Sequence, residues 1–68
     1  MPAVESSAIR TIDYDPRTRT LTVIFETGAR YEYFDVPEPE YIAFLAAESI
    51  GRHFAAFIRP RYKCRKLR

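Results

Sequence analysis

Basic residues dominate the chain from residue 52 onward. Residues 52–68 carry seven arginines and lysines and no acidic residue, whereas residues 1–51 carry four basic residues and all nine acidic ones. These two parts have net charges of +7 and −5, which the overall charge of +2 conceals. Guanidinium and ammonium groups bind phosphate oxygens, so this end suits an anionic partner. A solvated terminus that only aids solubility is the alternative. The basic residues are Arg52, Arg59, Arg61, Lys63, Arg65, Lys66 and Arg68.

Three tyrosines could add stacking to this charge. Tyr62 stands between Arg61 and Lys63, and a ring among cations can stack on an unpaired base. Tyr31 and Tyr33 are two residues apart, so on a strand their rings share one face. That face could be an open platform for bases or the wall of a small core. Tyr62 could equally fold back on the sheet.

Other kinds of chemistry have too few suitable residues. His53 and Cys64 are the only histidine and cysteine, which is too few for a typical metal site, and two glycines are too few for a phosphate-binding loop. We expect His53 on a helix surface, and Cys64 is either a reactive thiol or an inert one. No pair of titratable residues indicates acid–base catalysis. We therefore expect no catalytic residue, no cofactor and no metal, and hence no enzyme.

Length and composition predict one small domain. The chain has 68 residues, of which 47% are hydrophobic, and its single cysteine excludes an internal disulfide. A domain of this size needs nearly all its large apolar residues for the core. The first ten residues do not resemble a signal peptide, and no apolar run is long enough to span a membrane. We expect a cytoplasmic protein that does not insert into membranes.

The pattern along the chain predicts an α+β fold, a three-stranded antiparallel β-meander followed by two helices packed on one face. Alternating and β-branched segments separated by turn residues mark the strands, at 8–14, 20–25 and 29–36. Pro39 and the acidic residues beside it favour a first helix over 39–49, with Tyr41, Phe44 and Leu45 as its apolar stripe. A second helix over 52–58 would bury Phe54, Phe57 and Ile58. We assign a single domain to residues 1–68, with a core at 6–62 and a mobile tail at 63–68.

Loop lengths predict which residues share a face. A three-residue loop at 26–28 would pair Val23 with Tyr31 and Leu21 with Tyr33. A turn at 15–18 would place Tyr14 opposite Arg19. The first helix should cover the face that carries these tyrosines.

The opposite face mixes polar residues with apolar ones. The apolar residues that we expect there are Ile9, Ile24 and Phe34. Such a face could bind a protein partner or a second copy of the chain.

Several segments together resemble the KTSC domain, a short and mostly bacterial module. They are SSAIRTIDYD, TLTVIFETGARYEYFDVP, YIAFLAAESIGRHF and FIRPRY, and they cover about residues 6–62. The chain has Ala55 where the family often has Asn, so a polar role at that position is absent here. Such domains occur alone and at the C-terminus of some lysyl-tRNA synthetases, and that attachment implies RNA as a partner.

Two classes of function follow. The first is a non-enzymatic module that binds RNA, tRNA-like or single-stranded, or another nucleic acid with low sequence specificity. Its expected contacts are Arg52, Arg59, Arg61, Tyr62, Lys63, Arg65, Lys66, Arg68, Tyr31 and Tyr33. The second is a protein-interaction module or homodimer that uses the mixed face of the sheet. Salt dependence distinguishes them, because phosphate binding weakens with salt and apolar contacts do not.

Overall fold

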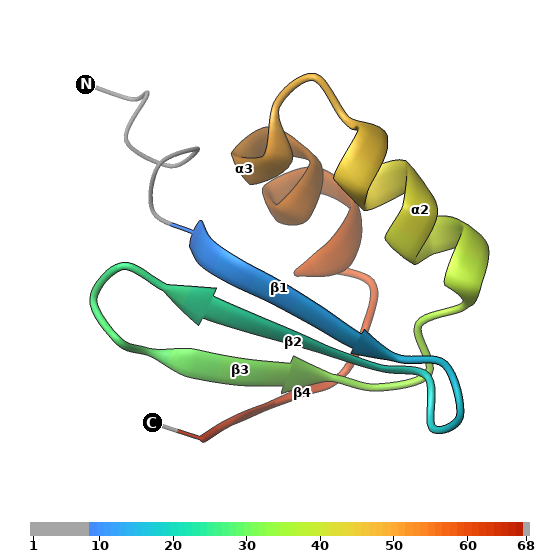
Figure 1. The fold of residues 1–68 in the computed structure, drawn as a ribbon, viewed down its shortest axis with the longest axis horizontal. Coiled ribbons are helices and arrows are strands. Elements are labelled where there is room, and N and C mark those ends of the chain that lie inside the picture. The colour runs from blue at the N-terminus through green and yellow to red at the C-terminus, as the bar shows by residue number, and fades with distance from the viewer. Residues whose placement is uncertain (1–8, 68) are drawn as a thin grey trace.

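The computed structural model describes residues 9–67, which form a four-stranded antiparallel sheet and a layer of helices (Figure 1). The strands lie in chain order across the sheet, so each pairs with its neighbours in sequence. Their bounds are β1 Ile9–Asp15, β2 Thr20–Phe25, β3 Arg30–Tyr33 and β4 Cys64–Lys66. The α+β class and the antiparallel meander are confirmed, but the prediction of three strands is wrong because β4 adds a fourth.

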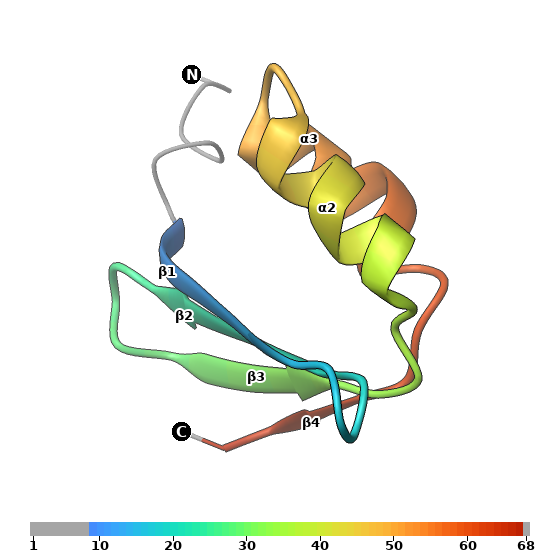
Figure 2. The ribbon, with the colours of Figure 1, turned by 45° about the vertical axis from the view of Figure 1, so that its right-hand side comes forward.

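The helices follow β3 and pack on one face of the sheet (Figures 1 and 2). Helix α2 spans Glu38–Ala46 and has a proline in its first turn. Helix α3, Ile50–His53, begins after Ser49, whose hydroxyl accepts the backbone N–H of Arg52 at 3.2 Å. It continues without a break into the π-helical turn η1, Phe54–Ile58. Helices on a single face are as predicted, and no helix within residues 9–67 is long and apolar enough to cross a membrane.

Strand β4 lies in the segment that we expected to be a mobile tail. Phe34 N–H donates to the carbonyl of Lys63 at 2.9 Å, and Leu67 N–H donates to the carbonyl of Arg30 at 2.6 Å. The prediction is therefore wrong for residues 63–67, while Arg68 lies outside the described residues. The segment forms a strand because β3 would otherwise leave unpaired N–H and C=O groups at the edge of the sheet. Pairing needs only backbone groups, so a segment of basic residues can pair as well as any other.

The hairpin between β2 and β3 has the predicted register. Val23 pairs with Tyr31 and Leu21 with Tyr33. The loop closes with Phe25 N–H donating to Ala29 at 2.9 Å. Gly28 has a φ of +96°, which explains a glycine at this position. The helix layer covers the face that carries both tyrosines, and the ring that meets Tyr33 is Phe54 of η1 rather than a residue of the first helix, α2.

The hairpin between β1 and β2 differs from the prediction by two residues. Tyr14 pairs with Leu21 rather than with Arg19, because the turn occupies residues 16–19 and Arg19 adopts a φ of 58°. A shift of two residues leaves every side chain on its predicted face. A one-residue irregularity between Ile9 and Thr11 does change a face, because Ile9 then packs against the core. Ile9 is thus lost from the mixed face.

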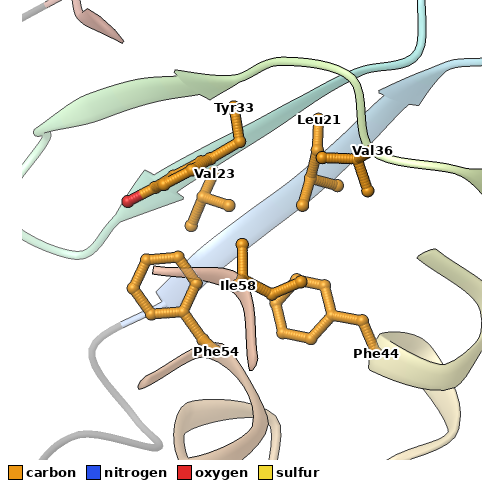
Figure 3. Close-up of a cluster of buried hydrophobic side chains, with 7 residues drawn as sticks. All are labelled: Leu21, Val23, Tyr33, Val36, Phe44, Phe54 and Ile58. Atoms are coloured by element: carbon orange, nitrogen blue, oxygen red, sulfur yellow. The ribbon is translucent and has the colours of Figure 1, made fainter. Parts of the chain in front are cut away.

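The core lies between the sheet and the helices (Figure 3). It consists of Leu21, Val23, Tyr33, Val36, Phe44, Phe54 and Ile58. At one side Tyr14 stacks on Tyr41 with 4.5 Å between ring centroids, and the Tyr14 hydroxyl donates to the carbonyl of Val36 at 2.6 Å. In each of the two predicted apolar stripes, one residue that we expected to be buried is exposed. Leu45 in the first helix is 49% exposed, and Phe57 in the second is 45% exposed.

Candidate nucleic-acid interface

Strand β4, at the edge of the sheet, and the turn that leads into it from η1 together carry five cations. We call this set the basic edge, and it consists of Arg59, Arg61, Lys63, Arg65 and Lys66. All five side chains are exposed. Pairing of β4 with β3 fixes the backbone of the last two, so their side chains leave the edge at defined positions.

Most of this charge has no carboxylate partner. Three ion pairs occur among residues 9–67, namely Arg10–Glu26, His53–Glu40 and Arg65–Glu32. The Arg65–Glu32 pair is 3.8 Å long and its arginine side chain is 69% exposed, so it contributes little stability. The other four members of the basic edge have no carboxylate partner in the described part of the chain. Their charge is available to an external anion.

The register of β4 places cations on both sides of the sheet. Lys66 lies opposite Tyr31 and therefore on the helix side, whereas Arg65 lies opposite Glu32 on the open face. In an antiparallel pair, only every second residue of a strand forms hydrogen bonds with the neighbouring strand. Lys63 and Leu67 bond to β3 and the residue that follows it, so the backbone N–H groups of Cys64 and Lys66 point away from the sheet. A phosphate beside this strand meets both side-chain and backbone donors.

Tyr33 belongs to the core and offers no face to a base. Its side chain is only 2% exposed and lies edge-on to Phe54 at 5.5 Å (Figure 3). Burial raises the pKa of Tyr33 to about 12, and the charge of Cys64 and a hydrogen bond with it act in the same direction. The core-wall alternative is therefore correct for Tyr33, and the prediction that it contacts nucleic acid is wrong.

Tyr31 differs from Tyr33 because its ring is only half-buried. Phe25 meets it edge-on at 5.6 Å, and Tyr33 lies beside it at 6.4 Å with 26° between the ring planes. Lys66 Nζ lies over the ring, 5.9 Å from its centroid, within the range of a cation–π interaction. The ring thus contacts both the aromatic residues around the core and Lys66 of the basic edge.

Tyr62 and Arg52 do not join the basic edge. Tyr62 is half-buried and packs against the core, and its hydroxyl donates to Glu40 Oε1 at 3.4 Å. Burial and the charge of Glu40 raise the pKa of Tyr62. It is folded back on the domain, which was the alternative to base stacking. Arg52 lies in α3 in the helix layer, whereas β4 lies in the sheet (Figures 1 and 2).

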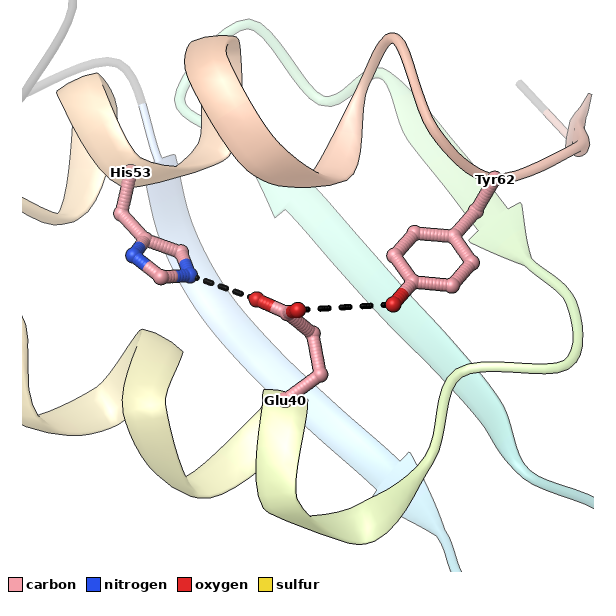
Figure 4. Close-up of polar contacts among 3 residues, drawn as sticks. All are labelled: Glu40, His53 and Tyr62. Atoms are coloured by element: carbon pink, nitrogen blue, oxygen red, sulfur yellow. Dashed lines mark hydrogen bonds and ion pairs between the residues drawn. The ribbon is translucent and has the colours of Figure 1, made fainter.

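The sequence did not indicate a polar network between the helices (Figure 4). His53 Nε2 lies 2.8 Å from Glu40 Oε2, and the other oxygen of this carboxylate accepts from Tyr62. The ring of His53 also contacts Phe44 and Phe57, at 5.5 and 4.9 Å between centroids. His53 is half-buried, so its predicted place on a helix surface is wrong. Glu40, His53 and Tyr62 come from three separate segments, and no local pattern relates them.

The open face of the sheet is unsuited to phosphate. A hollow of about 280 Å³ lies there, lined by four hydroxyl-bearing residues and by the carboxylates of Asp13, Asp15 and Glu32. These carboxylates repel an anion. Elsewhere within residues 9–67, no group of three His, Cys, Asp or Glu side chains is placed to hold a metal ion. The hollow on the open face is therefore no candidate for an anion-binding site.

Comparison with known proteins assigns the chain to a family. The KTSC domain family matches residues 5–62. A protein of Tsukamurella paurometabola is 43% identical over 93% of this chain and 94% of its own length. A lysine–tRNA ligase of Nostoc punctiforme is 40% identical over 93% of this chain, which corresponds to only 11% of the ligase.

One solved structure is similar to this chain in both fold and sequence. The crystal structure of a KTSC domain protein from Yersinia pestis superposes with a TM-score of 0.81 at 41% identity. The match covers 88% of this chain and 84% of that one. The chain belongs to the KTSC domain family.

Proposed function

We propose that this domain is a non-enzymatic module that binds RNA or another nucleic acid through its basic edge. The observation that carries the proposal is a row of exposed cations, four of which have no carboxylate partner among residues 9–67. Phosphates of a nucleic acid would neutralise these cations and release counterions.

Low sequence specificity follows from the kind of contact. Arginine and lysine side chains at an exposed edge hold phosphates, which are the same in every sequence. Reading a base edge requires donors and acceptors in fixed geometry, and the exposed side chains of the basic edge do not provide it. The acidic open face also limits the ligand to a path along β4 and the turn before it.

The lysine–tRNA ligase relatives support RNA as the ligand. In these proteins the matching region is about a tenth of the whole chain, so it is a small addition to an enzyme that handles tRNA. An added module with a basic edge would increase the contact of such an enzyme with RNA phosphates. By extension, we propose a cytoplasmic location for this domain, the compartment in which it would meet RNA.

The test is binding of a fluorescently labelled single-stranded RNA, followed by anisotropy over a series of salt concentrations. Four phosphate contacts predict a slope of about −3 for the logarithm of affinity against the logarithm of salt. Changing Arg61, Lys63 and Lys66 together to glutamine should reduce the slope by about 2. Circular dichroism should show an unchanged fold, because all three side chains are exposed.

A matched control removes three charges elsewhere. Glutamine substitutions on β1 and in the turn after it, at Arg10, Arg17 and Arg19, should leave the slope nearly unchanged. An equal loss in both triple variants would mean that only net charge matters and not the basic edge. Absence of binding at low salt would refute the nucleic-acid function.

Self-association through the mixed face is the second candidate. Ile24 and Phe34 remain available there as half-buried apolar residues, although Ile9 packs against the core. An apolar interface of this kind would give a salt-independent dimer, which light scattering detects. Ile24→Ser should abolish such a dimer, while leaving RNA binding intact.

A further inference from the structure

Tyr31 has a half-buried ring over which an exposed lysine side chain lies. Phe25 and Tyr33, which also contact the ring, belong to the aromatic packing around the core. Lys66 differs from them, because it is exposed and reaches over the ring from the edge strand. A ligand could take the place of the Lys66 ammonium group on the Tyr31 ring if the lysine side chain rotated away, and the core would not need to repack.

One cation contacts the Tyr31 ring directly, and a second lies near its neighbour Tyr33. Lys66 reaches it from β4, and Arg59, at the end of η1, is close enough to Tyr33 for its charge to act on that hydroxyl. A stacking ring with cations beside it is the arrangement that binds single strands, where the ring takes a base and the cations take neighbouring phosphates.

We propose that Tyr31 is a base-stacking position, and that Lys66 moves from its ring to an adjacent phosphate when a base takes its place. This inference rests on the proposed function and narrows its ligand to an unpaired strand. The base is held by its π-face, so any of the four bases can occupy the position.

The inference separates single strands from duplexes. A duplex carries about twice the phosphate charge per unit length, so phosphate contacts alone would favour the duplex. Bases inside a duplex are already stacked on one another and cannot reach a tyrosine ring without unpairing. Tighter binding of the single strand is therefore a sign of base contact.

The experiment uses the complete chain and three probes of matched length, namely an RNA single strand, the same RNA annealed to its complement, and inorganic polyphosphate. We expect the single strand to bind at least about fivefold more tightly than the other two, which is the lower range for one stacked base. Tyr31→Leu should remove this preference, whereas Tyr31→Phe should retain it because the ring remains. Tyr41→Leu is the matched control, since Tyr41 is also half-buried but stacks on Tyr14 at the β1 side.

Each outcome is decisive. Equal affinity for the three probes, with a steep salt dependence, would overturn the stacking position and leave the phosphate-binding function standing. No binding of any probe at low salt would overturn both. Because the probe comparison uses the unmodified protein, it holds even if Tyr31→Leu fails to fold. Loss of the preference in Tyr41→Leu as well as in Tyr31→Leu would also overturn the assignment to Tyr31.

Discussion

The buried hydroxyl of Tyr33 should make the domain lose stability at alkaline pH. Its pKa is raised to about 12 in the folded protein, mainly by burial and secondly by the charge of Cys64, whereas an exposed tyrosine titrates near 10. A raised pKa means that the folded state holds this proton more tightly than the unfolded state does. The stability that it contributes is therefore complete below about pH 10 and is lost between about pH 10 and 12.

The size of the effect follows from the two pKa values. Each unit between the folded and unfolded pKa is worth about 1.4 kcal/mol, so complete ionisation of Tyr33 would cost roughly 2.7 kcal/mol. At pH 11, where only the unfolded state is mostly ionised, the loss is about 1.4 kcal/mol. A domain of this length has a total stability of roughly 3–10 kcal/mol, so it should remain folded at that pH.

The assay is urea unfolding followed by circular dichroism at pH 8 to pH 11, with Tyr33→Phe as the reference. Phenylalanine keeps the ring in the core and removes the ionisable group, while all other side chains are the same in both proteins. With a urea dependence of about 1 kcal/mol/M for a small domain, the wild-type midpoint should fall by about 1.4 M more than that of the variant between pH 8 and pH 11.

A substitution at Cys64 provides a second test of why the pKa of Tyr33 is raised. Its charge at alkaline pH opposes ionisation of Tyr33, so Cys64→Ala should reduce the alkaline loss without abolishing it. Parallel loss of stability in wild type and Tyr33→Phe would show that the folded state holds the Tyr33 proton no more tightly than the unfolded state does, and would refute the reasoning.

Three further predictions concern stability. Deleting residues 64–68 exposes the edge of β3, so thermal unfolding should begin at lower temperature and gel filtration should show self-association of the truncated protein. Glu40→Ala leaves His53 and the Tyr62 hydroxyl without their acceptor and should cost about 1–3 kcal/mol in urea unfolding, whereas the exposed control Glu38→Ala should stay within about 0.5 kcal/mol. Phe44→Ala empties a fully buried site and should cost about 3–5 kcal/mol, enough to unfold much of the protein at room temperature; a near-native midpoint would mean that the core collapses around the gap.

The sequence predicts much of the sheet because loop length fixes strand register. The three-residue loop before β3 determined the partners of Tyr31 and Tyr33, and the structure has the same pairs. In the hairpin before it the turn was placed wrongly, yet the error of two residues preserved the faces. The irregularity at Ile9 has no signal in the amino-acid pattern, so the face of that residue could not be predicted.

The remaining differences arise from contacts between distant segments. β4 contains no run of β-branched or aromatic residues, and it forms because β3 offers an unpaired backbone. The contacts of Glu40 with His53 and Tyr62 depend on how α2 packs beside the following helix, which local periodicity does not encode. For the candidate interface, the sequence indicated the cations but not the edge strand that aligns them.

β4 joins the sheet by the longest connection in the fold, and this has a consequence for amide exchange. Tyr31 and Lys66 pair across 35 positions of sequence, whereas β1, β2 and β3 are linked by short turns. Only three residues hold β4 and all of them are exposed, so few apolar contacts oppose its release. Its detachment should be a local opening, less costly than global unfolding. The Leu67 amide should therefore exchange with deuterium faster than amides of β2, and it would report how often the basic edge comes apart while the core remains folded.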